Sequence, residues 1–188
     1  MRHKYATSAL VLSRSPLSEA SAYLSLLTSD FGLLRARVQS IRSSGAKLQS
    51  ALQTLCAADI VLVKGKEEWR VMGAIGKENF ARSLPYAARA RVARVASLLQ
   101  RLLHGESHDT DAYKIFTAFL VALPSLSLEE QDAAECLLAL RILRLSGHDA
   151  GDIPGSLNAY DAETLQTVLR TRSALVARIN HGIAASGL

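Results

Sequence analysis

The sequence predicts an α+β protein, in which a β-rich N-terminal half is followed by a helical C-terminal half. Up to about residue 78, apolar residues alternate or form short runs, which is typical of strands. Beyond that point they recur every three or four residues, which is typical of amphipathic helices. Strands followed by helices indicate a small β domain beside a helical one. A chain of 188 residues has room for both, and we place the domains at 1–78 and 79–188.

Five strands are predicted in the first half, at residues 6–12, 21–28, 33–41, 56–64 and 69–75. We expect turns or loops at 13–16, 42–47, 64–68 and 73–77. The first of these contains Pro16, which lacks the N–H that a central strand needs. In the third strand, Leu34 and Ala36 alternate with Arg35 and Arg37, which predicts an apolar face and a basic face. Five short strands in about 75 residues suit a β-barrel of the OB type.

Four helices are predicted in the second half, at residues 84–103, 111–122, 127–146 and 161–183. Pro85 suits the first turn of the first helix, because its missing N–H would have no partner there. Ser127 and Glu130 have the spacing of a capping box, and Gly147 is a typical residue just past a helix end. The last helix is expected to be continuous, with an apolar face of Leu165, Val168, Leu169, Val176 and Ile179.

The net charge of +5 lies entirely in the first half. Residues 1–78 hold eleven Lys and Arg against six Asp and Glu, whereas residues 79–188 hold eleven of each kind. A local basic field attracts polyanions and speeds their capture. The charge therefore indicates nucleic-acid binding or, as the plainer alternative, a solvated surface.

Membrane proteins and secreted proteins are not expected. The longest uncharged stretch, residues 115–128, is interrupted by Pro124 and is too short to span a bilayer. The N-terminal residues lack the long apolar run and the cleavage pattern of a signal peptide. Cys56 and Cys136 lie in apolar stretches, which favours buried free thiols in a reducing compartment. We expect a cytoplasmic, nucleoid-associated protein.

No motif indicates an enzyme. His104 and His108 have the spacing of a zinc pair on a helix, but their loop context with Gly105 favours exposed polar groups. The sequence contains neither a nucleophile elbow nor a cysteine-protease pattern. The glycines at 73 and 76 lack the spacing of a phosphate-binding loop. We therefore expect no catalytic residue, no metal and no cofactor.

The remaining prediction is a nucleic-acid site on the barrel, because OB barrels bind single strands with a basic groove and stacked aromatic rings. The first half has four aromatic residues, Tyr5, Tyr23, Phe31 and Trp69, and some of them must fill the core. Contacts to the phosphate backbone should then dominate, and binding should weaken steeply with salt. The candidate DNA-binding residues are Arg14, Arg35, Arg37, Arg42, Lys47, Lys64, Lys66 and Arg70.

Residues 9–53, ALVLSRSPLSEASAYLSLLTSDFGLLRARVQSIRSSGAKLQSALQ, resemble the N-terminal OB domain of the RecO family of bacterial recombination mediators. The matching steps lie at 18–21, 26–28 and 32–36, followed by a basic segment at 40–47. Residues 135–152 and the C-terminal segment from Thr164 resemble the family's helical part more loosely.

The chain departs from the family pattern in two places. It lacks the small module, carrying four zinc-binding cysteines in some members, that many members have between positions 152 and 161. Its basic loop begins Gln39-Ser40-Ile41-Arg42, which has one base and one glycine fewer than usual.

The resemblance implies a function without covalent chemistry. It implies binding of single- and double-stranded DNA, annealing of complementary strands and help in loading RecA onto strands coated by single-strand-binding protein (SSB). The implied partners are DNA, RecR, the acidic and apolar C-terminal tail of SSB and, indirectly, RecA. Residues that could hold a protein partner are Arg91, Arg94, Arg101, Leu140, Arg141, Leu143 and Arg144. For these arginines the alternative is ion pairing with the acidic middle segment.

Two rival hypotheses stay open. One is a protein-interaction scaffold that binds the SSB tail or a RecR-like partner without strong DNA binding. The other is an RNA-binding OB protein, since contacts to phosphate groups do not report the sugar.

Overall fold

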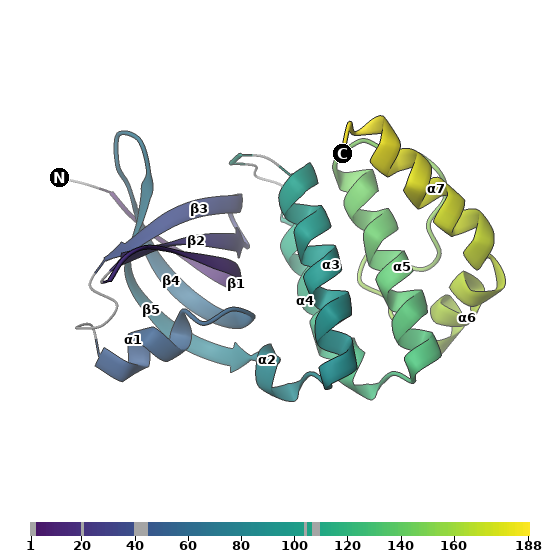
Figure 1. Cartoon of the computed structure of the whole chain (residues 1–188), viewed down its shortest axis with the longest axis horizontal. Helices are drawn as coiled ribbons and strands as arrows, with labels where there is room; N and C mark the ends of the chain where they lie inside the picture. The colour runs from purple at the N-terminus through teal and green to yellow at the C-terminus, as the bar shows by residue number, and fades with distance from the viewer. Residues whose placement is uncertain (1–2, 20, 40–44, 104, 107–109) are drawn as a thin grey trace. The chain divides into compact units, whose positions relative to one another are not determined.

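The structure, a computed structural model, describes residues 3–19, 21–39, 45–103, 105–106 and 110–188, with the side chains of 45–47 outside the description. Contacts divide the chain into two compact units. The first is Met1–Ser83 with Gly105–Tyr113, and the second is Leu84–His104 with Lys114–Leu188. The first unit holds the described strands and the second is helical, which confirms the predicted α+β class (Figure 1).

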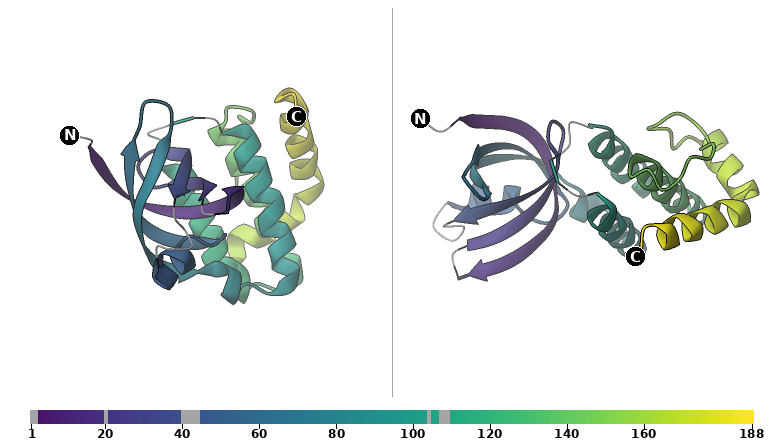
Figure 2. Two further views of the ribbon diagram at one scale, coloured as in Figure 1. Left: turned by 60° about the vertical axis from the view of Figure 1, so that its left-hand side comes forward. Right: turned by 90° about the horizontal axis from the view of Figure 1, so that it is seen from above.

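The first unit is a closed five-stranded barrel with the strand order β1-β2-β3-β5-β4. Its strands are β1 (Lys4–Ser18), β2 (Ser21–Thr28), β3 (Gly32–Gln39), β4 (Cys56–Lys64) and β5 (Trp69–Asn79). Neighbouring strands are antiparallel, except that β3 and β5 run parallel over a short stretch and so close the barrel. The predicted OB-type barrel is thereby confirmed, and Figure 2 shows it from two further directions.

The barrel core is formed by alternate residues of each strand. In β3, Leu34, Ala36 and Val38 are buried, whereas Arg35 and Gln39 are exposed, as the alternation predicts. Leu24, Leu26, Ile60 and Leu62 of the other strands belong to the same apolar core. In β3 the face away from this core carries Arg35, Arg37 and Gln39, which are exposed or half-buried.

The turn predicted at 13–16 is wrong, since these residues lie within β1. Pro16 pairs with Ala22 of β2, and register shifts on either side of this stretch bend the strand. Strand β4 pairs with the earlier part of β1, from Lys4 to Leu10. Pro16 therefore lies where the described barrel gives β1 a neighbour on one side, and its missing N–H interrupts no inner ladder.

The turn predicted at 73–77 is also wrong, because β5 continues to Asn79. Gly76 lies close to α1 (Gly45–Ala51), since a Cβ there would be in van der Waals contact with the Cα of Ala51, at 3.4 Å. Helix α1 packs on β5 and β4 and adds Ala51 to the barrel core. It begins inside the loop predicted at 42–47, of which residues 42–44 lie outside the described ones.

Helix α5 (Leu128–Leu145) is the centre of the helical unit. It packs against α3 (Tyr86–Leu102), α6 (Ala162–Arg170) and α7 (Arg172–Ala185), and its middle residues are buried. A helix that is apolar on all sides is typical of such a position. Ser127 and Glu130 form the predicted capping box, and Gly147 follows the helix with a φ of 78°. Helix α4 (Asp111–Ala122) and the 3-10 helix Leu123–Ser125 follow α3 in the chain, whereas the short helix α2 (Phe80–Ser83) belongs to the first unit.

The helix predicted as continuous at 161–183 is instead two helices, α6 and α7, that meet at Thr171. Residues 170–174 are all exposed, and Ala174 is the only hydrophobic residue among them. The Thr171 hydroxyl donates to the Thr167 carbonyl at 2.9 Å, a local bond that competes with regular helix geometry. Without packing through this turn, the chain is free to change direction.

Among the described residues, none of the helices combines the length and the apolar character that a membrane span requires.

Candidate nucleic-acid interface

Barrel closure brings basic residues from three strands into one row. Tyr23 of β2 is opposite Arg37 of β3, and Arg37 is opposite Arg70 of β5. Arg70 pairs in turn with Val63 of β4, which pairs with Lys4 of β1. We call Lys4, Arg37 and Arg70, together with Tyr23, the basic row.

The three cations of the basic row line one groove of about 510 Å³, together with Gln39, Val63, Val71 and Met72. Met72 is 59% exposed, so the groove offers apolar surface beside positive charge. Cationic grooves with apolar or aromatic surface suit single-stranded nucleic acid, whose phosphates and bases need different neighbours.

The carboxylate of Glu68, in the β4–β5 hairpin, lies among these groups. The Tyr23 hydroxyl donates to Oε2 of Glu68 at 3.0 Å. Oε1 of Glu68 lies 3.4 Å from Nε of Arg70 and 3.7 Å from Nη1 of Arg37. Both contacts are ion pairs by distance. In the described part of the chain, the buried Nε atoms of both arginines have no hydrogen-bond acceptor. Two guanidinium groups thus share one carboxylate and keep unsatisfied donors.

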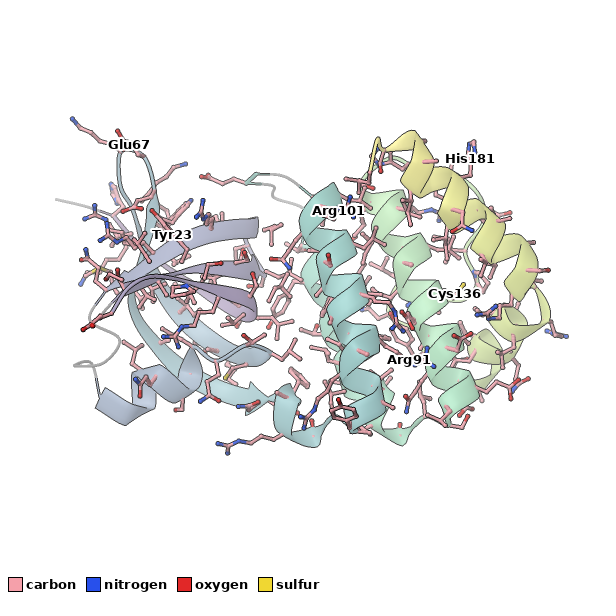
Figure 3. The ribbon with its side chains drawn as sticks, viewed as in Figure 1. Tyr23, Glu67, Arg91, Arg101, Cys136 and His181 are labelled. Atoms are coloured by element: carbon pink, nitrogen blue, oxygen red, sulfur yellow. The ribbon has the colours of Figure 1, made fainter. Side chains whose placement is uncertain are left out.

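Tyr23 is the aromatic side chain beside these cations. The guanidinium carbon of Arg35 lies 4.0 Å from the centre of the Tyr23 ring, in a cation–π contact. Tyr5, Phe31 and Trp69 instead pack together, with ring centres 5.4–5.6 Å apart, against the barrel core. Figure 3 labels Tyr23 on the barrel and Glu67, the neighbour of Glu68, on the β4–β5 hairpin.

The other predicted DNA-binding residues do not join the basic row. Nζ of Lys64 lies 2.8 Å from a Glu106 oxygen, and the second oxygen of Glu106 accepts a hydrogen bond from Trp69. Arg14 in β1 and Lys66 in the hairpin are exposed, and neither has an acidic partner in the described ranges. Arg42 lies outside the described residues, as does the side chain of Lys47.

Sequence reasoning missed Lys4 and Glu68. The strand alternation that turns Tyr5 toward the core also turns Lys4 outward, so a signal for Lys4 existed. Its place in the same groove as Arg70 depends on the pairing of β4 with both β1 and β5, and β1 is far from β4 in the chain. Glu68 lies in the turn between β4 and β5, and the sequence does not show which strands the side chain of a turn residue contacts.

In the helical unit, two of the three predicted partner-binding arginines of α3, Arg91 and Arg94, form ion pairs with α5. Nη1 of Arg91 lies 2.7 Å from Glu135 and 3.2 Å from Asp132. Arg94 makes two hydrogen bonds to Glu135, of 2.6 and 2.8 Å. Asp132 also accepts from Nε of Arg172 at 2.5 Å, and this bond lowers the pKa of the Asp132 carboxyl. These contacts are the ion pairing that the sequence offered as the alternative for these arginines.

Three of the four predicted partner-binding residues of α5, Leu140, Arg141 and Leu143, are buried. Leu140 and Leu143 are fully buried, and Arg141 is 2% exposed. Arg141 donates to the carbonyls of Ser156 and Ala159 at 2.7 and 2.9 Å, so it holds the loop before α6, and its burial lowers its pKa. Arg144 is exposed and donates to the carbonyl of Gly151.

A second groove, of about 730 Å³, lies between α3, α5 and α7. Its apolar lining includes Leu98, Cys136, Ala139, Val176, Ile179 and Ile183. Arg101 also lines it and is exposed, with no acidic partner in the described residues (Figure 3). Burial raises the pKa of the Cys136 thiol to about 11, so this thiol stays protonated at neutral pH.

Metal-binding groups of three or more His, Cys, Asp or Glu side chains do not occur among the residues that the structure describes. The predicted polar pair His104 and His108 lies outside those residues.

Comparisons with known proteins match both halves of the chain. Residues 1–72 match the family model described as recombination protein O N terminal. A DNA repair protein RecO of Heliobacterium modesticaldum is 31% identical over 145 residues, which cover 77% of this chain and 52% of that protein. Another, of Bifidobacterium longum subsp. infantis, is 25% identical over 146 residues, which cover 76% and 61%. One of Dehalococcoides mccartyi is 32% identical over 78 residues, which cover 42% and 31%. The chain spans about half the length of the curated relatives it matches.

Proposed function

Because this chain belongs to the RecO family, we propose that it acts in DNA repair and recombination and that its barrel binds DNA through the basic row. The observation that carries the proposal is the shortage of acceptors around Arg37 and Arg70. Both keep a buried Nε without an acceptor in the described chain, and both line a groove with Lys4. Phosphate oxygens would supply acceptors that the protein does not.

The proposed activity is strand annealing, and it requires no catalytic residue. Cations that neutralise the phosphates of two strands lower the repulsion that opposes their pairing. Contacts of this kind bind single- and double-stranded DNA without reading the sequence. In the cytoplasm, at the nucleoid, the same activity would assist loading of RecA onto strands coated by SSB, together with RecR.

A titration of fluorescent single-stranded DNA at several salt concentrations tests this proposal. We expect binding with a steep salt dependence, and faster annealing when the complementary strand is added. A matched RNA oligonucleotide should compete about equally, because phosphate contacts do not distinguish the sugars. Absence of DNA binding at low salt would contradict the proposal.

The groove of the helical unit supports a second candidate function, docking of the SSB tail. An acidic and apolar peptide needs an apolar floor with a cation at its edge. This groove has the floor in Cys136 and Val176, and Arg101 at its edge has no acidic partner among the described residues. We expect Arg101→Glu to weaken binding of an SSB tail peptide about tenfold, through loss of the charge-assisted contact. Arg89→Glu, which changes an α3 residue outside the groove lining, is the matched control. Equal effects of the two changes would contradict docking in this groove.

A further inference from the structure

We propose that the Glu68 carboxylate occupies a phosphate subsite in the basic row, and that DNA binds there by displacing it. The inference rests on the proposed DNA-binding function. It assigns Glu68 as an internal competitor of the DNA backbone, which sets how tightly the barrel binds.

The donors around Glu68 define an anion site built from three strands. Tyr23 of β2 donates its hydroxyl proton to Glu68, and Arg37 of β3 and Arg70 of β5 face the other carboxylate oxygen. Guanidinium and phenol groups serve a carboxylate and a phosphodiester alike, because both ligands present anionic oxygens. The position of Glu68 therefore marks a place where one phosphate group fits.

Glu68 satisfies this site poorly. Its distances of 3.4 and 3.7 Å to the arginine nitrogens exceed the roughly 2.7–2.9 Å of a charge-assisted hydrogen bond. The buried Nε atoms of Arg37 and Arg70 remain without an acceptor in the described chain. A phosphodiester has two charged oxygens in a tetrahedral arrangement, and the next phosphate along the strand can reach Lys4 in the same groove. DNA can thus satisfy donors that a single carboxylate leaves unmet.

Glu68 can also leave the site at little cost. It lies between β4 and β5 in a hairpin that is closed by the backbone bond from Gly65 N–H to the Glu68 carbonyl at 2.9 Å. Its backbone can therefore stay in place while the side chain moves. The side chains of Glu68, Arg37 and Arg70 are 22%, 29% and 41% exposed, and ion pairs this accessible to water are weak.

The test compares Glu68→Gln with Glu67→Gln in the titration of fluorescent single-stranded DNA. The two changes alter net charge equally and lie next to each other in one hairpin. Glu67 is exposed and has no ion-pair partner among the described residues, so it is the matched control. We expect Glu68→Gln to tighten DNA binding about five- to tenfold, and Glu67→Gln to change it by less than about twofold.

A third variant, Glu68→Asp, keeps the net charge and shortens the side chain by one methylene. We expect it to tighten binding by an intermediate factor, which a change in the overall field cannot produce. Thermal unfolding of each variant checks that the barrel is intact.

Equal effects of Glu68→Gln and Glu67→Gln would overturn the inference, because the change in net charge alone would then explain both. Weaker binding by Glu68→Gln would also overturn it, because Glu68 would then hold the arginines in their binding geometry. In both cases binding by the unmodified protein would leave the proposed function standing. Failure of the unmodified protein and of all three variants to bind DNA would instead overturn both.

Discussion

Both units of the molecule place a glutamate between two arginines, but they satisfy those arginines to different degrees. In the helical unit, Glu135 receives hydrogen bonds of 2.6–2.8 Å from Arg91 and Arg94, and Asp132 adds a second acceptor. In the barrel, Glu68 lies 3.4 and 3.7 Å from Arg70 and Arg37.

Unsatisfied donors distinguish the two clusters further. Among the described residues, the buried arginine nitrogens without an acceptor belong to Arg37, Arg70 and Arg141, and not to the cluster around Glu135. Well-satisfied arginines hold helices together, whereas poorly satisfied ones keep an affinity for anions from outside the chain. The same two residue types therefore serve structure in one unit and, as we propose, DNA binding in the other.

The largest expected effect is on the affinity of the barrel for DNA. Arg37→Gln combined with Arg70→Gln should weaken single-stranded DNA binding about a hundredfold, since two phosphate contacts are lost. The slope of log affinity against log salt should become shallower by about 1.5. Filter binding or fluorescence anisotropy at three salt concentrations measures both quantities. Unchanged affinity in the doubly substituted protein would place the DNA site elsewhere.

The next effect concerns stability in the helical unit. Glu135→Gln removes the shared charge from Arg91 and Arg94, and the Glu135 side chain is only 16% exposed. We expect the free energy of unfolding to fall by about 2 kcal/mol, measured by urea denaturation. DNA affinity should stay within about twofold of the unmodified protein, because the cluster already satisfies its own donors. A loss of DNA binding without a loss of stability would contradict this prediction, because the cluster around Glu135 would then serve DNA binding and not the stability of the fold.

The smallest effect is a dependence of stability on acid pH. The hydrogen bond from Arg172 holds the pKa of the Asp132 carboxyl below its usual value, and Arg91 adds to this effect. A lowered folded-state pKa stabilises the fold fully above the ordinary aspartate pKa of about 4, and this contribution is lost as pH falls through the folded-state value. Asp132→Asn should therefore unfold more easily than the unmodified protein at pH 7, and the difference should shrink below about pH 4. Urea titrations at pH 7, 4 and 3 measure it, and a difference that does not change with pH would contradict the assignment.

Local patterns predicted the helices and strands well where packing reinforced them. The ranges 21–28, 56–64 and 111–122 match β2, β4 and α4, and the capping box at Ser127 is present. Alternation also separated the buried Leu34 from the exposed Arg35. Three errors lay at Pro16, Gly76 and Thr171. Pairing with β2 and with β4 keeps Pro16 and Gly76 within strands, and the lack of packing around Thr171 lets the helix end there.

The candidate site was predicted less completely than the fold. Arg35, Arg37 and Arg70 follow from composition and strand alternation, and they do lie near one another. Lys64 carries the same charge and lies in a strand as well, yet Glu106, from a segment more than forty residues away, holds it. Charge counted along a sequence does not record which cations the folded chain has already neutralised.

The order of amino acids was thus sufficient to specify a basic barrel and a helical unit, because period and charge are local properties of the chain. Tertiary structure alone decided which cations keep unsatisfied donors. Barrel closure pairs β3 with β5 and β1 with β4, and so places Lys4, Arg37 and Arg70 around one groove, with the Glu68 carboxylate between the two arginines. That balance of donors and acceptors depends on distances across strands, which no pattern along the sequence contains.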